Sequence, residues 1–153
     1  MDLIVWRHAQ AQDPSECGDD LERRLTARGQ KDAARIGRWL DRHLPDDTRI
    51  LVSPAARCEQ TAQALRRTYR ICPELAPGAT PGGMLALAQW PAATAPVLLV
   101  GHQPALGALV ALLLGISAPS LSIRKGALWW LRHGTRAAEE RVIVHAVMNP
   151  DRD

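Results

Sequence analysis

The stretch Val97–Pro104, which reads Val-Leu-Leu-Val-Gly-His-Gln-Pro, decides the fold class. Its four consecutive apolar residues are typical of a strand that is buried on both faces. The run stops at Gly101 and His102, and Pro104 then opens a helix whose apolar residues extend to Leu114. A short buried strand followed directly by a helix is typical of a parallel α/β sheet.

The same unit occurs twice before this stretch. Leu3–Trp6 is a bounded apolar run, and after a polar loop the residues from Thr26 to Leu44 follow helical spacing. Arg49–Val52 is a second short run. It leads into Ser53 and Pro54, which are predicted to be the N-cap and the first residue of another helix.

The remaining apolar segments complete the predicted architecture. Tyr69–Cys72 predicts a weaker third strand, and the residues around Met84–Trp90 predict a short helix. Ala127–Leu131 and Val142–Val147 predict two late strands, the first of them near the edge of the sheet. We therefore expect a single domain over residues 1–153, a three-layer α/β sandwich whose central sheet is mostly parallel and covered by helices on both faces.

Composition excludes several classes of protein. The chain has 153 residues, of which 46% are hydrophobic and 23% charged, so a disordered or collagen-like chain is excluded. The net charge of +3 is small and the basic residues alternate with acidic ones, so no nucleic-acid partner is expected.

The three cysteines lack CxxC spacing, which argues against disulfides and a zinc cluster and for a reducing compartment. We expect no signal peptide, because the N-terminus has an acid at position 2 and few apolar residues, and the apolar run Ala105–Ile116 is too short to span a bilayer. We therefore predict a cytoplasmic protein without membrane contact.

Polar side chains with related chemistry follow three of the predicted strands. Arg7 and His8 follow the first strand, Arg57 lies shortly after the second, and His102 follows the strand that begins at Val97. In open α/β sheets ligands bind beyond the carboxyl ends of the strands. The two arginines and two histidines are therefore expected to converge at one edge of the sheet.

Such a cluster suits phosphoryl transfer. Guanidinium groups match the oxygens of a phosphate, and a histidine nitrogen can form a covalent intermediate. A second, protonated histidine would neutralise the charge that develops on the transferring group. Helix N-termini near Pro54 and Pro104 would add N–H groups to an anion site.

Five short motifs carry a resemblance to a known family. Arg7-His8-Ala9 resembles the Arg-His-Gly signature of the histidine phosphatase superfamily, whose fold is phosphoglycerate-mutase-like. Ser53-Pro-x-x-Arg57 and Gly101-His102 stand where that family has its second arginine and second histidine. Arg23-Arg24-Leu25-Thr26-x-x-Gly29 and Pro73-Glu74-Leu75-x-Pro77 resemble further motifs of its short branch, the SixA-type phosphohistidine phosphatases.

The resemblance implies a role for each residue of the cluster. His8 would be the phosphorylated nucleophile, Arg7 and Arg57 would bind the phosphate, and His102 would stabilise the transferring group. The family needs no metal and no cofactor, so none is expected. Arg23 is a further candidate for contact with the phosphate or for the rim of the site, the alternative being a solvated loop residue.

The sequence departs from the family pattern at two places. Ala9 replaces the usual glycine, so a methyl group must be accommodated next to the nucleophile. The acidic proton donor of larger members is absent, because Leu75 is followed by alanine and proline. Glu74 is the nearest carboxylate, and a surface position is the favoured interpretation of it.

The missing acid favours one substrate class. An alkyl phosphate ester needs its alkoxide leaving group protonated, whereas a phosphohistidine releases imidazole, whose pKa near 6.5 makes it a good leaving group. The sequence therefore predicts a phosphatase that acts through a phosphohistidine intermediate on a phosphorylated protein. The alternatives are a broad phosphomonoesterase that takes small phosphate esters and a non-catalytic phosphoprotein-binding module, with a metal site built on His8 and His102 as a distant fourth. A homodimer stays open and would be indicated by an exposed tryptophan at Trp129 or Trp130.

Overall fold

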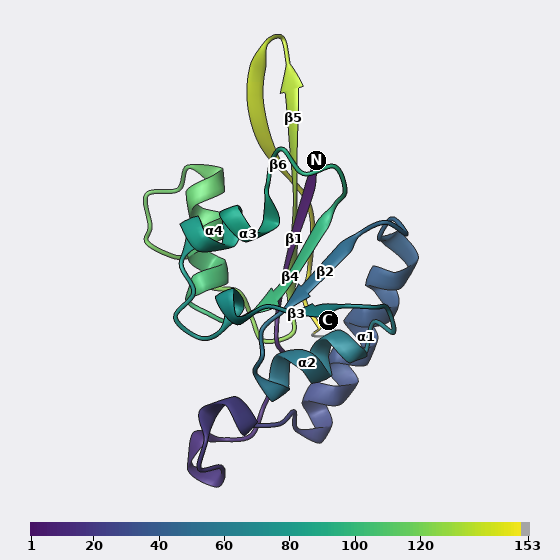
Figure 1. Cartoon of the computed structure of the whole chain (residues 1–153), viewed down its shortest axis with the longest axis vertical. Coiled ribbons are helices and arrows are strands. Elements are labelled where there is room, and N and C mark those ends of the chain that lie inside the picture. The colour runs from purple at the N-terminus through teal and green to yellow at the C-terminus, as the bar shows by residue number, and fades with distance from the viewer. Residues whose placement is uncertain (151–153) are drawn as a thin grey trace.

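The computed structural model describes residues 1–150 as one six-stranded sheet with helices on both faces (Figure 1). The last three residues of the predicted domain, 151–153, lie outside this range. The strands follow one another in the order β3-β2-β4-β1-β5-β6. Their bounds are β1 (Asp2–Arg7), β2 (Arg49–Val52), β3 (Arg70–Ile71), β4 (Val97–Gly101), β5 (Leu128–Arg136) and β6 (Glu139–Met148).

The sheet is parallel on one side and antiparallel on the other. β3, β2, β4 and β1 are parallel neighbours, while β5 runs antiparallel to β1 and β6 antiparallel to β5. Ala127–Leu131, expected near the edge of the sheet, lies at the start of β5, the strand next to the edge. A turn at Ala137 and Ala138 closes a long hairpin, so β6 pairs along the outer side of β5 and becomes the edge strand itself.

The helices are divided between the two faces of the sheet, as predicted. α1 (Ala27–His43) and α2 (Ala56–Gln63) cover one face, and α3 (Pro81–Ala88) and α4 (Ala105–Leu114) cover the other (Figure 1). Residues 1–150 also contain three short 3-10 turns: η1 (Pro14–Glu16), η2 (Asp20–Glu22) and η3 (Pro73–Leu75). In the part of the chain that the structure describes, no helix is both long and apolar enough to cross a membrane.

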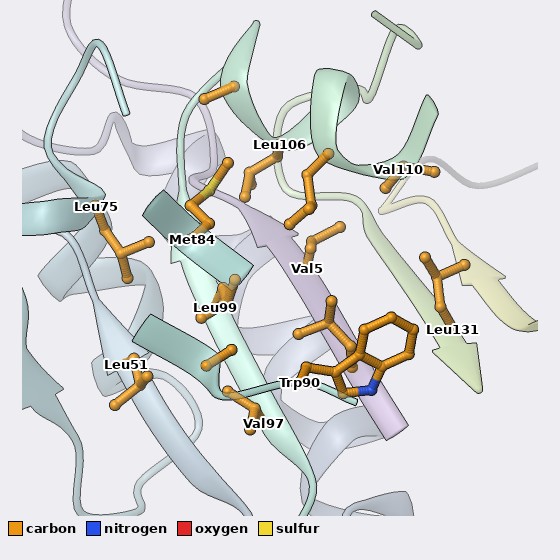
Figure 2. Packing of buried hydrophobic residues seen from close by; sticks show 14 of the residues in the cluster. Val5, Leu51, Leu75, Met84, Trp90, Val97, Leu99, Leu106, Val110 and Leu131 are labelled. Atoms are coloured by element: carbon orange, nitrogen blue, oxygen red, sulfur yellow. The ribbon is translucent and has the colours of Figure 1, made fainter. Parts of the chain in front are cut away.

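Strand periodicity creates two separate cores. Successive side chains of a strand point to opposite faces, so Leu3 and Val5 of β1 pack toward α3 and α4 while Ile4 and Trp6 pack toward α1 and α2. Figure 2 shows the first of these clusters, in which strand residues meet apolar side chains of α3 and α4. Because both faces are buried, the central strands are continuously apolar rather than alternating.

The two adjacent tryptophans of β5 are divided in the same way. Trp130 is buried with the α1 and α2 cluster, as predicted for one of the pair, and Trp129 is half-buried against the α3 and α4 cluster. Neither is the exposed tryptophan that would indicate a dimer surface.

Two predicted helix starts need correction. Ser53 is not an N-cap and Pro54 is not the first helical residue, because α2 begins at Ala56 with Ala55 at the cap position. The short helix predicted around Met84 begins earlier, at Pro81, where the hydroxyl of Thr80 caps it. The hydroxyl of Ser53 is used elsewhere, in the site described below.

Candidate active site

The four predicted residues do converge at the carboxyl ends of the parallel strands. Arg7 and His8 follow β1, His102 follows β4, and Arg57 lies in the first turn of α2, directly after β2. They line a cavity of about 340 Å³. Its lining residues are Arg7, His8, Ala11, Pro14, Arg23, Arg57, Pro77, His102, Gln103 and Lys125.

The chain around His8 is anchored to the start of α1. Thr26 caps this helix by accepting from the backbone N–H of Gly29, and its own backbone N–H donates to the carbonyl of Gln10 at 3.0 Å. A Cβ on Gly29 would lie 2.0 Å from the Gln10 carbonyl oxygen, so only glycine permits this approach. The Arg23–Gly29 motif therefore has a structural reason: it fixes the segment that follows the nucleophile.

His8 is buried and neutral. Its Nδ1 lies 2.8 Å from the carbonyl oxygen of Ala9, which can only accept, so Nδ1 carries the proton and Nε2 keeps a free electron pair. Burial lowers the pKa of His8 to about 3, and the nearby charges of Arg57 and Arg7 act in the same direction. A neutral imidazole with a free nitrogen is the form that a nucleophile requires.

His102 faces His8 across the cavity, with 5.4 Å between the ring centroids. Its Nδ1 accepts from the guanidinium of Arg57 at 3.3 Å, so Nε2 carries the proton and donates to the Ser53 hydroxyl at 2.8 Å. Burial, and then the charge of Arg57, lowers the pKa of His102 to about 4. The surrounding positive charge therefore opposes protonation of His102, so the protonated form expected from the sequence requires an anion to offset that charge.

Both arginines line the cavity, and each is held by hydrogen bonds to the protein. Arg57 donates through Nη1 and Nη2 to Asp20, and Arg7 donates through Nη1 to the carbonyl of Ile123 at 2.8 Å. The Nε atoms of Arg7 and Arg57 are both buried and have no hydrogen-bond partner among residues 1–150. Buried donors are almost always paired, and phosphate oxygens are strong partners for guanidinium groups.

Ala9 does not obstruct the site. Its methyl group is fully buried with Leu25 and Ala33, and its backbone N–H donates to the hydroxyl of Thr61 at 3.1 Å. Ala9 is not among the residues that line the cavity. The replacement of the family glycine is thus absorbed by a small apolar cluster.

The other two candidate residues differ in position. Arg23 lines the cavity with its side chain only 16% exposed, so it is not the solvated loop residue of the alternative interpretation. Glu74 lies exposed on η3 and is not among the lining residues. As predicted from its helix face, Cys58 is part of the core, and burial raises the pKa of its thiol to about 12.

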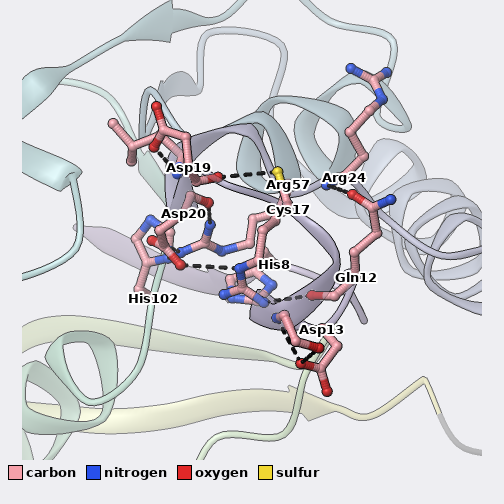
Figure 3. Close-up of polar contacts among 12 residues, drawn as sticks. His8, Gln12, Asp13, Cys17, Asp19, Asp20, Arg24, Arg57 and His102 are labelled. Atoms are coloured by element: carbon pink, nitrogen blue, oxygen red, sulfur yellow. Dashed lines mark hydrogen bonds and ion pairs between the residues drawn. The ribbon is translucent and has the colours of Figure 1, made fainter.

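Sequence reasoning missed Asp20 and the role of Ser53. Asp20 lies in a polar loop without periodicity, yet its carboxylate contacts Arg57 (Figure 3) and also Arg23. Ser53 belongs to the same motif as Arg57, but its sequence context predicts a helix cap and not its contact with His102. Among residues 1–150, no group of three or more histidine, cysteine, aspartate or glutamate side chains is arranged to hold a metal ion.

Comparison with known proteins agrees with this geometry. The family profile described as histidine phosphatase superfamily (branch 1) matches residues 3–78. The phosphohistidine phosphatase SixA of Escherichia coli K12 is 31% identical over 119 residues, which are 72% of this chain and 73% of that protein. An uncharacterized protein of a Picosynechococcus strain is 33% identical over 142 residues, 88% of this chain and 86% of that protein.

The chain belongs to the histidine phosphatase superfamily. Among solved structures, a SixA protein of Nakamurella multipartitia is 29% identical with a TM-score of 0.80, covering 97% of this chain and 95% of that one. The protein histidine phosphatase SixA in complex with tungstate is 25% identical with a TM-score of 0.76, covering 98% of this chain and 97% of that one. The predictions of a phosphatase, of its SixA-type branch and of its fold are confirmed.

The neutral histidines of this histidine phosphatase predict a loss of stability in mild acid. Both have a lower pKa in the folded chain than in the unfolded chain, so the unfolded state binds more protons between about pH 6.5 and pH 4. The free energy of unfolding is therefore expected to fall by about 2–4 kcal/mol from pH 7 to pH 4.5, as measured by urea unfolding. His102→Gln should show a smaller fall. If the free energy of unfolding fell equally with pH in wild type and in His102→Gln, the buried, neutral state of His102 would be contradicted.

Proposed function

We propose that the chain is a metal-independent phosphohistidine phosphatase in which His8 carries the phosphoryl group between substrate and water. One observation supports this above the others: the guanidinium-bearing residues Arg7 and Arg57 line the same cavity as His8, whose imidazole is neutral. A phosphoryl group would supply acceptor oxygens to both arginines.

The first step is an in-line displacement at phosphorus. The free electron pair of His8 Nε2 forms the new N–P bond while the bond from phosphorus to the leaving group breaks, and that electron pair departs with the leaving group. Arg7 and Arg57 hold the phosphoryl oxygens and balance their charge. The dianionic phosphoryl group offsets the positive charge around His102, which raises the pKa of His102 toward its usual value. When Nη2 of Arg57 turns from His102 Nδ1 to a phosphoryl oxygen, Nδ1 can take a proton, and the charged His102 stabilises the transferring group.

The second step returns His8 to its starting state. Water attacks the phosphoryl group on Nε2, the N–P bond breaks with its electron pair returning to His8, and inorganic phosphate leaves. The Nδ1 proton stays on its bond to the Ala9 carbonyl throughout, so the same nitrogen is free at the start of each cycle.

The lining of the cavity favours a substrate with a good leaving group. No aspartate or glutamate is among the described residues that line it. Asp20 contacts Arg57 from outside this lining. Burial acts to raise the pKa of Asp20, but hydrogen bonds and charge from Arg57 and Arg23 bring it below its ordinary value, so at neutral pH it is ionised and cannot donate a proton. A phosphohistidine on a protein, whose imidazole leaves without strong acid assistance, fits such a site better than an alkyl ester.

The substrate class can be tested by comparing three substrates in excess chelator. The proteins to assay are wild type and His8→Ala. The substrates are a phosphohistidine-bearing protein, an aryl phosphate and an alkyl phosphate. We expect turnover of the first two, with the alkyl ester slower by about 100-fold or more because no acid assists its departure. Equal turnover of the alkyl ester would favour the small-molecule phosphomonoesterase. Phosphoprotein binding without turnover would favour the non-catalytic module, and loss of activity in chelator would contradict metal independence.

A further inference from the structure

Asp20 places a carboxylate directly on the buried arginine of the site. Its Oδ2 lies 3.1 Å from Nη2 of Arg57, and its backbone carbonyl accepts from Nη1 of the same guanidinium at 2.7 Å. Its Oδ1 accepts from Nε of Arg23 at 3.0 Å. One residue thus holds two of the three arginines that line the cavity, and Figure 3 shows its contact with Arg57.

The two sides of this contact differ in exposure. The side chain of Arg57 is 4% exposed, whereas that of Asp20 is 52% exposed and lies on the surface turn η2. A surface loop therefore provides the counter-charge for a cation inside the site. Since a guanidinium buried without a counter-charge is costly, this contact contributes to holding Arg57 in place.

The loop is built to keep Asp20 there. The side chain of Asp19 caps η2 by accepting from the backbone N–H of Leu21 at 3.0 Å. Arg23 joins the far side of the turn to the start of the loop by donating to the carbonyl of Gln12 at 2.7 Å. The position of Asp20 thus follows from several hydrogen bonds within the loop rather than from the ion pair alone.

The carboxylate and a phosphoryl group compete for the same positive charge. Nη2 of Arg57, which binds Asp20, also lies 3.3 Å from Nδ1 of His102, so the carboxylate belongs to the network that would meet the phosphoryl oxygens. Two anions that share one guanidinium repel each other, and the repulsion is large at separations of a few ångströms.

We propose that Asp20 is a positioning residue that keeps Arg57 in place while its negative charge weakens the binding of inorganic phosphate, so that the product leaves the site. This inference rests on the proposed function, because it assumes that the cavity is a phosphate site. Asp20 does not touch the reacting atoms; it acts through Arg57 and Arg23. Arg57 can thus stay ordered between turnovers without the site retaining the phosphate that each turnover releases.

The test is direct binding of inorganic phosphate, measured by titration calorimetry without any substrate. Asp20→Asn keeps a side-chain acceptor and the backbone contact to Arg57 but removes the charge. We expect it to bind phosphate about tenfold more tightly than wild type, and we expect added salt to reduce this difference, because the effect is electrostatic. Asp20→Glu should restore wild-type affinity. Glu22→Gln, a charge removal at an exposed position on the same turn, should leave the affinity unchanged.

The outcomes separate this inference from the proposed function. Unchanged or weaker phosphate binding by folded Asp20→Asn, or an equal gain in Glu22→Gln, would overturn the role of Asp20 while leaving the phosphate site intact. Asp20→Ser, a second neutral variant, should also bind inorganic phosphate more tightly than wild type. Failure of wild type and all variants to bind phosphate would overturn the proposed function and this inference with it.

Discussion

Replacing His8 with alanine is expected to lower kcat for a phosphohistidine-bearing protein and for an aryl phosphate by about 10⁴-fold or more. The substitution removes the only atom assigned to bond with phosphorus, and the remaining arginines can bind phosphate but cannot accept it covalently. The measurement is steady-state phosphate release from both substrates in excess chelator.

The control for this prediction is a histidine outside the site. His43 lies exposed at the end of α1, where its Nδ1 bonds to the carbonyl of Trp39 at 2.7 Å. His43→Ala should keep wild-type turnover. His8→Ala should also keep the ability to bind inorganic phosphate, which shows that the site still folds. Wild-type turnover by His8→Ala would mean that another residue is the nucleophile.

Replacing Arg57 with alanine is expected to reduce kcat/KM on the order of 10³-fold. The change removes a guanidinium that lines the cavity, and with it the positive charge proposed to hold the phosphoryl oxygens. Arg57→Lys should recover only part of the loss, because an ammonium group restores the charge but not the forked set of donors.

A matched control exists for this arginine as well. Arg67 forms an ion pair with Asp41 at 3.0 Å outside the residues that line the cavity, so Arg67→Ala should leave kcat/KM unchanged. Removal of Arg57 also leaves Asp20 without its ion pair, so the double variant Arg57→Ala with Asp20→Asn should be measured. If that double variant regained wild-type kcat/KM, the loss would come from an unpaired Asp20 and not from lost phosphate contacts.

The site could be predicted from sequence because parallel topology brings distant residues together. His8 and His102 lie far apart along the chain, but each follows a strand of the same sheet, and β1 and β4 are direct neighbours. Buried strands such as Val97–Gly101 are recognisable as continuous apolar runs because helices cover both faces. Once the strands are located, the residues that follow them are expected to meet.

The features that could not be predicted from the sequence depend on tertiary contacts. Asp20 belongs to a surface loop, and nothing in its neighbours indicates that its carboxylate reaches Arg57. The hydroxyl of Ser53 has a typical capping sequence around it, but β2 and β4 bring it within 2.8 Å of His102 instead. The low pKa of His102 arises from its burial and from the nearby charge of Arg57. Neither its burial nor its distance from Arg57 can be known before the fold is known.

The most direct test of the central claim is to trap the phosphorylated enzyme. Wild type is mixed with the phosphohistidine-bearing protein, quenched within milliseconds at alkaline pH, where phosphohistidine survives, and digested for mass spectrometry. We expect one added phosphoryl group on the peptide that contains His8. It should form and disappear at rates that match turnover, and it should be absent from His8→Ala. A phosphoryl group found on another residue, or full turnover without any phosphorylated enzyme, would contradict the central claim.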